Sequence, residues 1–174
     1  RNPRPFFAAL RALKDSGEIG PARLQVVLRA TGSDHIYRPM LTELNLTDIV
    51  KLAPTANYRE ALREMLVADG LLLFQASICN HQVPAKLYEY LRAGRPIFTL
   101  TDPIGNTADV LRAAEAMDIV NIADADDITV GLRHFLGRLQ DGSATGARRE
   151  IANLHSRRSR TRELARLLDQ IAIE

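Results

Sequence analysis

The segment GLLLFQASICNHQVPAKLYEYLRAGRPIFTL, residues 70–100, places one amphipathic stretch between two apolar runs. The runs are GLLLFQ (70–75) and RPIFTL (95–100), and their lack of polar alternation is typical of strands that are covered on both faces. Pro84 suits the first turn of a helix, because proline is pre-set at a helical φ and its missing N–H would have no partner there. The segment therefore predicts a strand, a helix and a second strand, which together form a parallel βαβ unit.

Similar short runs predict three more strands, with helical patterns around them. We expect the strands at 24–29, 48–52 and 118–122, and the helices from Asn2 and Pro3 onward, at 37–44, after Asn57, at 129–139 and, rich in arginine, at 147–173. Strands that alternate with helices form right-handed βαβ units. We therefore predict an α/β class: a Rossmann-like, doubly wound and mostly parallel sheet flanked by helices, with a long C-terminal helix. Ligands of such sheets bind beyond the carboxyl ends of the strands.

The composition favours a single domain over residues 1–174 and excludes several classes of protein. A chain of 174 residues, 46% of them hydrophobic, can bury a full core. The net charge of +2 is far from the dense basic surface of nucleic-acid-binding proteins, so we expect no nucleic acid partner. Cys79 is the single cysteine and the four histidines are scattered, so we expect neither a disulfide framework nor a metal site, and a cytoplasmic location.

The start of the predicted helix after Gln82 and Val83 is a candidate anion site. Unpaired N–H groups and the helix dipole give this end a partial positive charge, and Lys86 adds a full charge, so a diphosphate is the expected ligand. Glu89 lies about one turn further along the same edge, where a carboxylate can accept two hydrogen bonds from a vicinal diol. The alternative is that Lys86 and Glu89 form a surface ion pair with i,i+3 spacing and bind nothing.

The stretch VPAKLYEYLRAGRPIF (83–98) resembles a segment in the C-terminal, donor-binding half of glycosyltransferases with two Rossmann-like domains, the GT-B fold. The form P-x-K-x-x-E-Y-x-x-x-G-(R/K)-P is typical of group 1-like bacterial enzymes that build surface polysaccharides and glycolipids. Further stretches are similar to the family and occur in the same order: RNPRPFFAALRAL (1–13), DIVKLAPTANYREALREMLVADGLLLF (48–74) and IGNTADVLRAAEAMDIVNIADADDI (104–128).

The resemblance implies a nucleoside diphosphate sugar as donor, a transferase reaction, and no metal or other cofactor. It places Glu89 on the donor ribose, and Lys86, the residue expected to take part in catalysis, beside the diphosphate. His81 stands where the family has the first glutamate of a spaced pair, so sugar recognition is expected to fall to this residue and its neighbours. The residues expected to bind the nucleotide sugar next to Glu89 are Asn80, His81, Gln82, Val83 and Pro84.

Five more positions are candidates for a place near the donor. The family holds the base in the loop after the second of these strands, which here contains Pro54 and Thr55. Tyr58 either forms a wall of that base pocket or is a buried core residue. Arg1 is expected to approach a phosphate. Thr107 begins a helix after a strand end, and is either a plain N-cap or a contact to the donor sugar or phosphate.

The resemblance also implies a partner, the N-terminal acceptor-binding domain of the same protein, so residues 1–174 are expected to be a fragment. The acceptor is expected to be a polysaccharide or a glycolipid, and retention of the sugar's configuration is favoured. Two other functions stay open: a nucleotide-sugar epimerase of the same fold, and a non-catalytic Rossmann-like interaction module. The arginine-rich terminal helix is either a solvated surface or is attracted to anionic lipid or a lipid-linked acceptor, peripherally at the inner membrane face.

Overall fold

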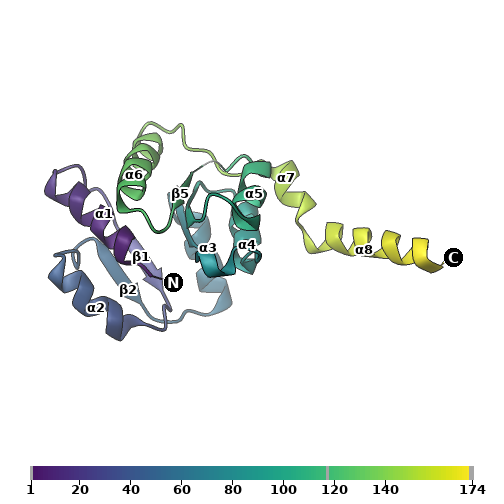
Figure 1. Cartoon of the computed structure of the whole chain (residues 1–174), viewed down its shortest axis with the longest axis horizontal. Helices are drawn as coiled ribbons and strands as arrows, with labels where there is room; N and C mark the ends of the chain where they lie inside the picture. The colour runs from purple at the N-terminus through teal and green to yellow at the C-terminus, as the bar shows by residue number, and fades with distance from the viewer. Residues whose placement is uncertain (1, 117, 173–174) are drawn as a thin grey trace.

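Strands alternate with helices along residues 2–116 and 118–172, which the computed structural model describes (Figure 1). This order confirms the predicted α/β class. The strands are β1 (Val26–Arg29), β2 (Val50–Ala53), β3 (Leu71–Phe74), β4 (Ile97–Thr101) and β5 (Ile119–Asn121). The helices are α1 (Arg4–Asp15), α2 (Asp34–Glu43), α3 (Tyr58–Val67), α4 (Ala85–Ala93), α5 (Asn106–Ala113), α6 (Ala125–Gln140), α7 (Arg149–Leu154) and α8 (Arg157–Ala172), with a short 3-10 turn η1 (Ser77–Cys79) before α4.

All strand pairs are parallel, as predicted, but the strands form two sheets instead of one. β1 pairs with β2, with Val26 opposite Val50, and β3 pairs with β4, which in turn pairs with β5. The N–H of Val26 donates to the Ile49 carbonyl at 2.8 Å. Because successive N–H groups point to opposite edges of a strand, the N–H of Val27 points away from β2. No strand of the described residues pairs with that edge of β1.

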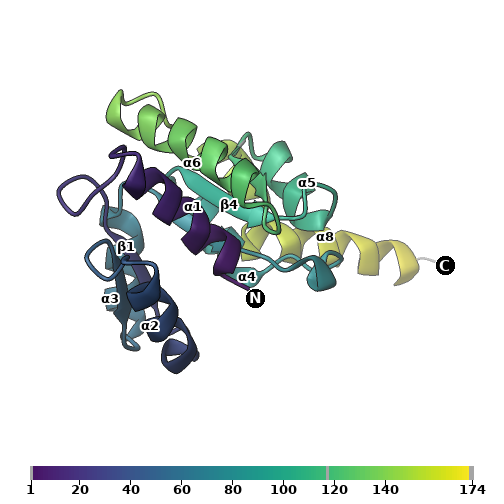
Figure 2. The ribbon, with the colours of Figure 1, turned by 60° about the vertical axis from the view of Figure 1, so that its left-hand side comes forward.

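α1 packs against both sheets and joins them. Its apolar residues follow helical spacing, and Phe6, Phe7 and Leu10 are all buried. The Phe6 ring meets Phe74 of β3 edge-on, with 5.4 Å between the ring centroids, and the Phe7 ring meets Tyr37 of α2 at 6.1 Å. α6 lies beside α1 over the same core (Figure 2). Burying each such side chain stabilises the fold by roughly 1.5 to 3 kcal/mol.

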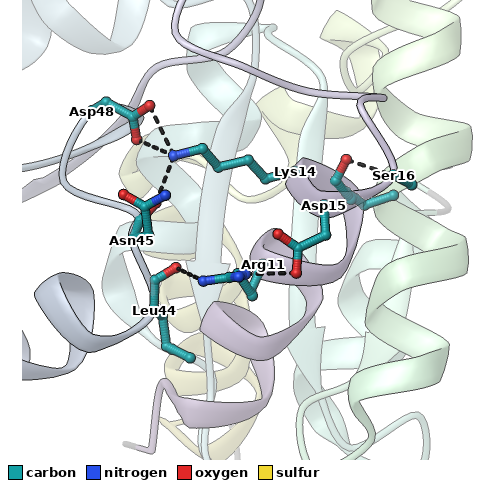
Figure 3. Close-up of polar contacts among 8 residues, drawn as sticks. Arg11, Lys14, Asp15, Ser16, Leu44, Asn45 and Asp48 are labelled. Carbon is teal, nitrogen blue, oxygen red and sulfur yellow. Dashed lines mark hydrogen bonds and ion pairs between the residues drawn. The ribbon is translucent and has the colours of Figure 1, made fainter.

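Polar contacts fix the C-terminal end of α1 to the loop between α2 and β2 (Figure 3). Lys14 Nζ donates to the two carboxylate oxygens of Asp48, at 2.7 and 2.8 Å, and to the Asn45 carbonyl. Arg11 Nη1 donates to the Leu44 carbonyl at 3.2 Å. The Lys14 amine lowers the pKa of the Asp48 carboxyl below its ordinary value. The loop before β2 is therefore held by charged groups on the surface of α1.

The long C-terminal helix predicted over 147–173 is two helices, α7 and α8, and residue 173 lies outside the described residues. Ser156 starts the second helix, because its hydroxyl accepts a hydrogen bond from the Ser159 N–H at 3.2 Å. The Ser159 hydroxyl donates to the Asn153 carbonyl at 2.8 Å, at the end of α7. α8 projects from the body of the domain (Figure 1). Of the described helices, none is both long and apolar enough to cross a membrane.

Candidate functional site

The residues predicted from the 70–100 segment lie at the carboxyl edge of the three-stranded sheet. β3 ends at Phe74 and continues through η1 to α4, and β4 ends at Thr101 and continues through a short loop to α5. The two loops are joined by hydrogen bonds between residues more than 20 positions apart in the sequence. The starts of α4 and α5 therefore lie side by side, at the edge where ligands of parallel sheets bind.

Lys86 and Glu89 stand on the exposed side of α4. The helix starts at Ala85, with Pro84 as its N-cap and no side chain capping it. The N–H of Leu87 donates to the Pro84 carbonyl at 2.9 Å, so the first-turn N–H groups left for a ligand are those of Ala85 and Lys86. Lys86 and Glu89 are both exposed, and neither side chain takes part in a hydrogen bond or ion pair among the described residues. The alternative of a Lys86–Glu89 surface pair is therefore not realised in the structure.

The opposite side of α4 packs on the sheet, as the pattern predicted. Leu87 and Leu91 are fully buried in a core with Leu71 and Ile97 of the two strands. Burial raises the pKa of the Tyr90 phenol, and the charge of Glu89 adds to this rise. The buried face fixes how α4 is rotated, so Lys86 and Glu89 face outward on a rigid support.

Two buried polar side chains hold the loop that leads into α4, residues 75–84, which we call the α4 loop. Gln75, which is 3% exposed, donates from Nε2 to the carbonyls of Cys79 and Gln82 at 3.0 and 3.1 Å. Thr107 is also buried, and its hydroxyl donates to the same Gln82 carbonyl at 3.1 Å. The plain N-cap reading of Thr107 is wrong, because α5 starts one residue earlier, at Asn106, with Gly105 as its N-cap.

Asn80 and its neighbours join the two loops. The Asn80 amide donates to Asp102 Oδ2 at 3.1 Å and to the Ile104 carbonyl. Asn106 Nδ2 donates to the His81 carbonyl at 3.1 Å. Sequence reasoning missed Gln75, Asp102, Gly105 and Asn106 as parts of this arrangement. A polar residue that ends an apolar strand, as Gln75 does, was the one available signal.

The remaining predicted residues are exposed or partly exposed. The side chains of His81 and Gln82 are exposed, whereas Val83 and Pro84 are partly buried. Pro54 and Thr55 are exposed and follow β2, in the other sheet. Arg29 Nη1 donates to the Pro54 carbonyl at 2.6 Å and so orders that loop.

Tyr58 and Arg1 are the last two positions that the sequence placed near the donor. Tyr58 is 69% exposed, so the expectation of a buried core tyrosine is wrong. Its place as a wall of a base pocket stays a prediction. Arg1 lies outside the described residues.

Two hollows occur on the described surface, and both lie away from α4. A hollow of about 320 Å³ lies at the amino end of the two-stranded sheet, beside Gln25, Thr47 and Val50, and one of about 210 Å³ lies between α1 and α2. Neither hollow is lined by a residue of the candidate site at α4. No group of three possible metal ligands occurs among the described residues.

Comparison with protein-family models, curated proteins and solved structures gave no match to the chain. What is established is an α/β fold with parallel strands and a helix start at the carboxyl edge of one sheet. The donor-binding function expected from residues 83–98 therefore stays a proposal.

Proposed function

We propose that residues 1–174 bind a nucleoside diphosphate sugar and form the donor-binding domain of a GT-B glycosyltransferase. One observation carries this proposal. The start of α4 places the exposed residues Ala85, Lys86 and Glu89 together at the carboxyl edge of a parallel sheet, and the side chains of Lys86 and Glu89 have no protein partner among the described residues. A cation and a helix start suit a diphosphate, and a carboxylate about one turn further suits the diol of a ribose.

Catalysis in this proposal is chiefly charge stabilisation. When the bond between the sugar and the diphosphate breaks, negative charge grows on the leaving diphosphate. Lys86 and the start of α4 stabilise that charge more in the transition state than in the substrate. The acceptor, a polysaccharide or glycolipid, and the base that activates its hydroxyl belong to the N-terminal domain in this scheme. The isolated 174-residue chain should therefore bind donor nucleotide and transfer no sugar.

Calorimetric titration with uridine and guanosine diphosphates tests the binding step. Lys86→Ala should weaken binding by about tenfold or more, because a charge-assisted hydrogen bond contributes roughly 1.5 to 3 kcal/mol. Arg92→Ala is the matched control, since it removes an exposed cation from the other end of α4. If neither nucleotide binds to the wild-type chain, the interaction-module alternative is favoured. If the two variants lose the same affinity, Lys86 has no special role.

Glu89→Gln separates recognition of the ribose from recognition of the phosphates. The substitution should weaken the binding of nucleoside diphosphates and leave the affinity for inorganic diphosphate unchanged, because only the nucleoside diphosphates carry a diol for the carboxylate. An equal loss for both ligands would show that Glu89 does not bind the ribose.

Turnover tests the enzymatic step in a protein that also carries the acceptor-binding domain. Lys86→Ala should lower turnover by on the order of 10² to 10³, as for other preorganised anion sites. Unchanged turnover would remove Lys86 from the mechanism. Product analysis distinguishes a glycosylated acceptor from the isomerised nucleotide sugar that an epimerase would release.

A further inference from the structure

Asn80 connects the two loops that lead into α4 and α5. Its side-chain amide donates to Asp102 Oδ2 at 3.1 Å and to the Ile104 carbonyl. Its own carbonyl accepts a hydrogen bond from the N–H of Asn106, the first residue of α5, at 3.1 Å. One residue of the α4 loop therefore holds the α5 loop at three positions.

Gly105 completes this contact, because its missing side chain leaves the room that Asn80 fills. The backbone of Gly105 is extended, with φ 163° and ψ 167°, so a residue with a side chain could adopt it. A Cβ atom at this position would overlap the carboxamide of Asn80. A side chain at 105 would therefore force the Asn80 carboxamide to move, whereas the backbone conformation itself would not oppose it.

We propose that Asn80 and Gly105 form an interlocked pair that positions the diphosphate site, an inference that rests on the proposed function. Through this pair the α4 loop sits where the carbonyls of Asn80, His81 and Gln82 accept hydrogen bonds from protein donors. Carbonyl oxygens that are bonded in this way are directed at protein donors, and the backbone groups that must face a diphosphate at the start of α4 are N–H groups. Asn80 is then a positioning residue, and the ligand is contacted by other groups.

A double-mutant cycle tests the interlock without any ligand. Gly105→Ala alone should lower the midpoint of thermal unfolding, because the new methyl group collides with Asn80. In an Asn80→Ala background the same substitution should cost much less, since the carboxamide is gone. Equal costs in the two backgrounds would overturn the interlock.

Nucleotide affinity tests the positioning role, with uridine and guanosine diphosphates titrated into each variant. The variant Asn80→Ala/Gly105→Ala should be more stable than Gly105→Ala, yet bind about tenfold more weakly than the wild type, because the lost amide hydrogen bonds let the loops shift. If Asn80 and Gly105 only pack against each other, the double variant should regain nucleotide affinity together with stability. That result would show that the positioning role is wrong. Asn153→Ala, at an exposed asparagine of α7, is the matched control and should bind as the wild type does.

The two proposals fail in different ways. If the wild-type chain binds neither nucleotide, the proposed function and the positioning role fail together, whatever the double-mutant cycle shows. If the wild type binds and the double variant binds equally tightly, the donor site stands and only the role of Asn80 is wrong.

Discussion

The three-stranded and two-stranded halves of the molecule bury their strands to different extents. Every residue of β4 is buried, and α4 buries Leu87, Tyr90 and Leu91 against its sheet. In the two-stranded half, Val27 of β1 is 44% exposed. The helix α3 connects the two halves, through the pair of Glu64 with Arg29 and through contacts with α4, and has no buried residue. The candidate donor site therefore stands on the better packed half, which suits a site that must hold its geometry.

The difference follows from composition. The strand β4 reads IFTLT and has no charged residue, whereas β1 and β2 carry Arg29 and Lys51. Both halves carry surface ion pairs, such as Arg29 with Glu64 in the two-stranded half and Arg138 with Asp118 beside β5 in the other. The halves differ instead in how much apolar surface their strands bury. Exposed pairs of this kind contribute about 0 to 1 kcal/mol each. The stability of the domain should therefore reside mainly in the three-stranded half and in α1 and α6.

Two matched leucine substitutions test the difference in burial between α4 and α3, and we expect the largest effect from them. Leu91→Ala, in α4, should destabilise the domain by roughly 2 to 5 kcal/mol, because it leaves a cavity in a fully buried site. Leu66→Ala, in α3, removes a side chain that is 51% exposed and should stay within about 0.5 kcal/mol. Urea unfolding of both variants gives the comparison. Equal losses would show that α3 is packed as firmly as α4.

The capping box of α3 offers a second test. The Asn57 side chain accepts from the Glu60 N–H at 3.0 Å, and the Glu60 carboxylate accepts from the Asn57 N–H at 3.2 Å. Asn57→Ala should cost about 1 kcal/mol and speed amide exchange within α3, because packing does little to hold this helix. Asn57→Asp keeps the acceptor and serves as the control. Unchanged exchange in the alanine variant would mean that other contacts hold α3.

Acid sensitivity tests an ion pair between the loop after α1 and α6. Arg133 and Ser16 donate to the Glu18 carboxylate, at 2.9 and 2.7 Å, and lower its pKa from 4.5 to about 2. The folded state binds this proton less tightly than the unfolded state, so the contribution is complete above pH 4.5 and is lost as the pH falls toward 2.

The test measures the midpoint of thermal unfolding of Glu18→Gln and of the wild type as the pH falls from 4.5 toward 2. The variant should show a smaller decrease on acidification, because it has no carboxylate to protonate. Glu43→Gln, at an exposed glutamate of α2, should follow the wild type. If Glu18→Gln also follows the wild type, the ion pair does not couple to folding.

Amide exchange at the edge of β1 that faces away from β2 is the last test. It should show the smallest effect, because it compares two N–H groups of the wild type and involves no change in stability. The N–H of Val27 points away from β2 and should exchange faster than that of Val26, which is bonded to Ile49. Exchange measured residue by residue by NMR gives the ratio. Equal protection would show that a further strand pairs with β1 and that the two halves form one sheet.

The order of the elements could be predicted from the sequence because it depends on local patterns. Apolar runs flanked by turn residues predicted β3 and β4, and Asn57 predicted the start of α3. Helix boundaries were less accurate, as for α6, which starts at Ala125 because Asp124 caps it, four residues before the predicted position. The break at Ser156 was also missed, because a serine cap inside a polar stretch gives no periodic signal.

Contacts between distant segments could not be predicted. The division into two sheets depends on which strand edges meet, and the exposure of Tyr58 depends on what packs above it. Thr107 is not the N-cap, because α5 starts one residue earlier. The pairing of Asn80 with Gly105 joins loops that local patterns describe one at a time.

The sequence by itself determined the α/β class, the helix that starts after Pro84, and the presence of Lys86 and Glu89 on one side of it, since hydrophobic periodicity and proline chemistry act over a few residues. The tertiary structure alone decided that α5 starts beside α4, that Gln75 and Thr107 support the loop that leads into α4, and that the Lys86 side chain has no protein partner among the described residues. The physical reason is that hydrogen bonding and burial of a side chain depend on neighbours supplied by other strands and loops.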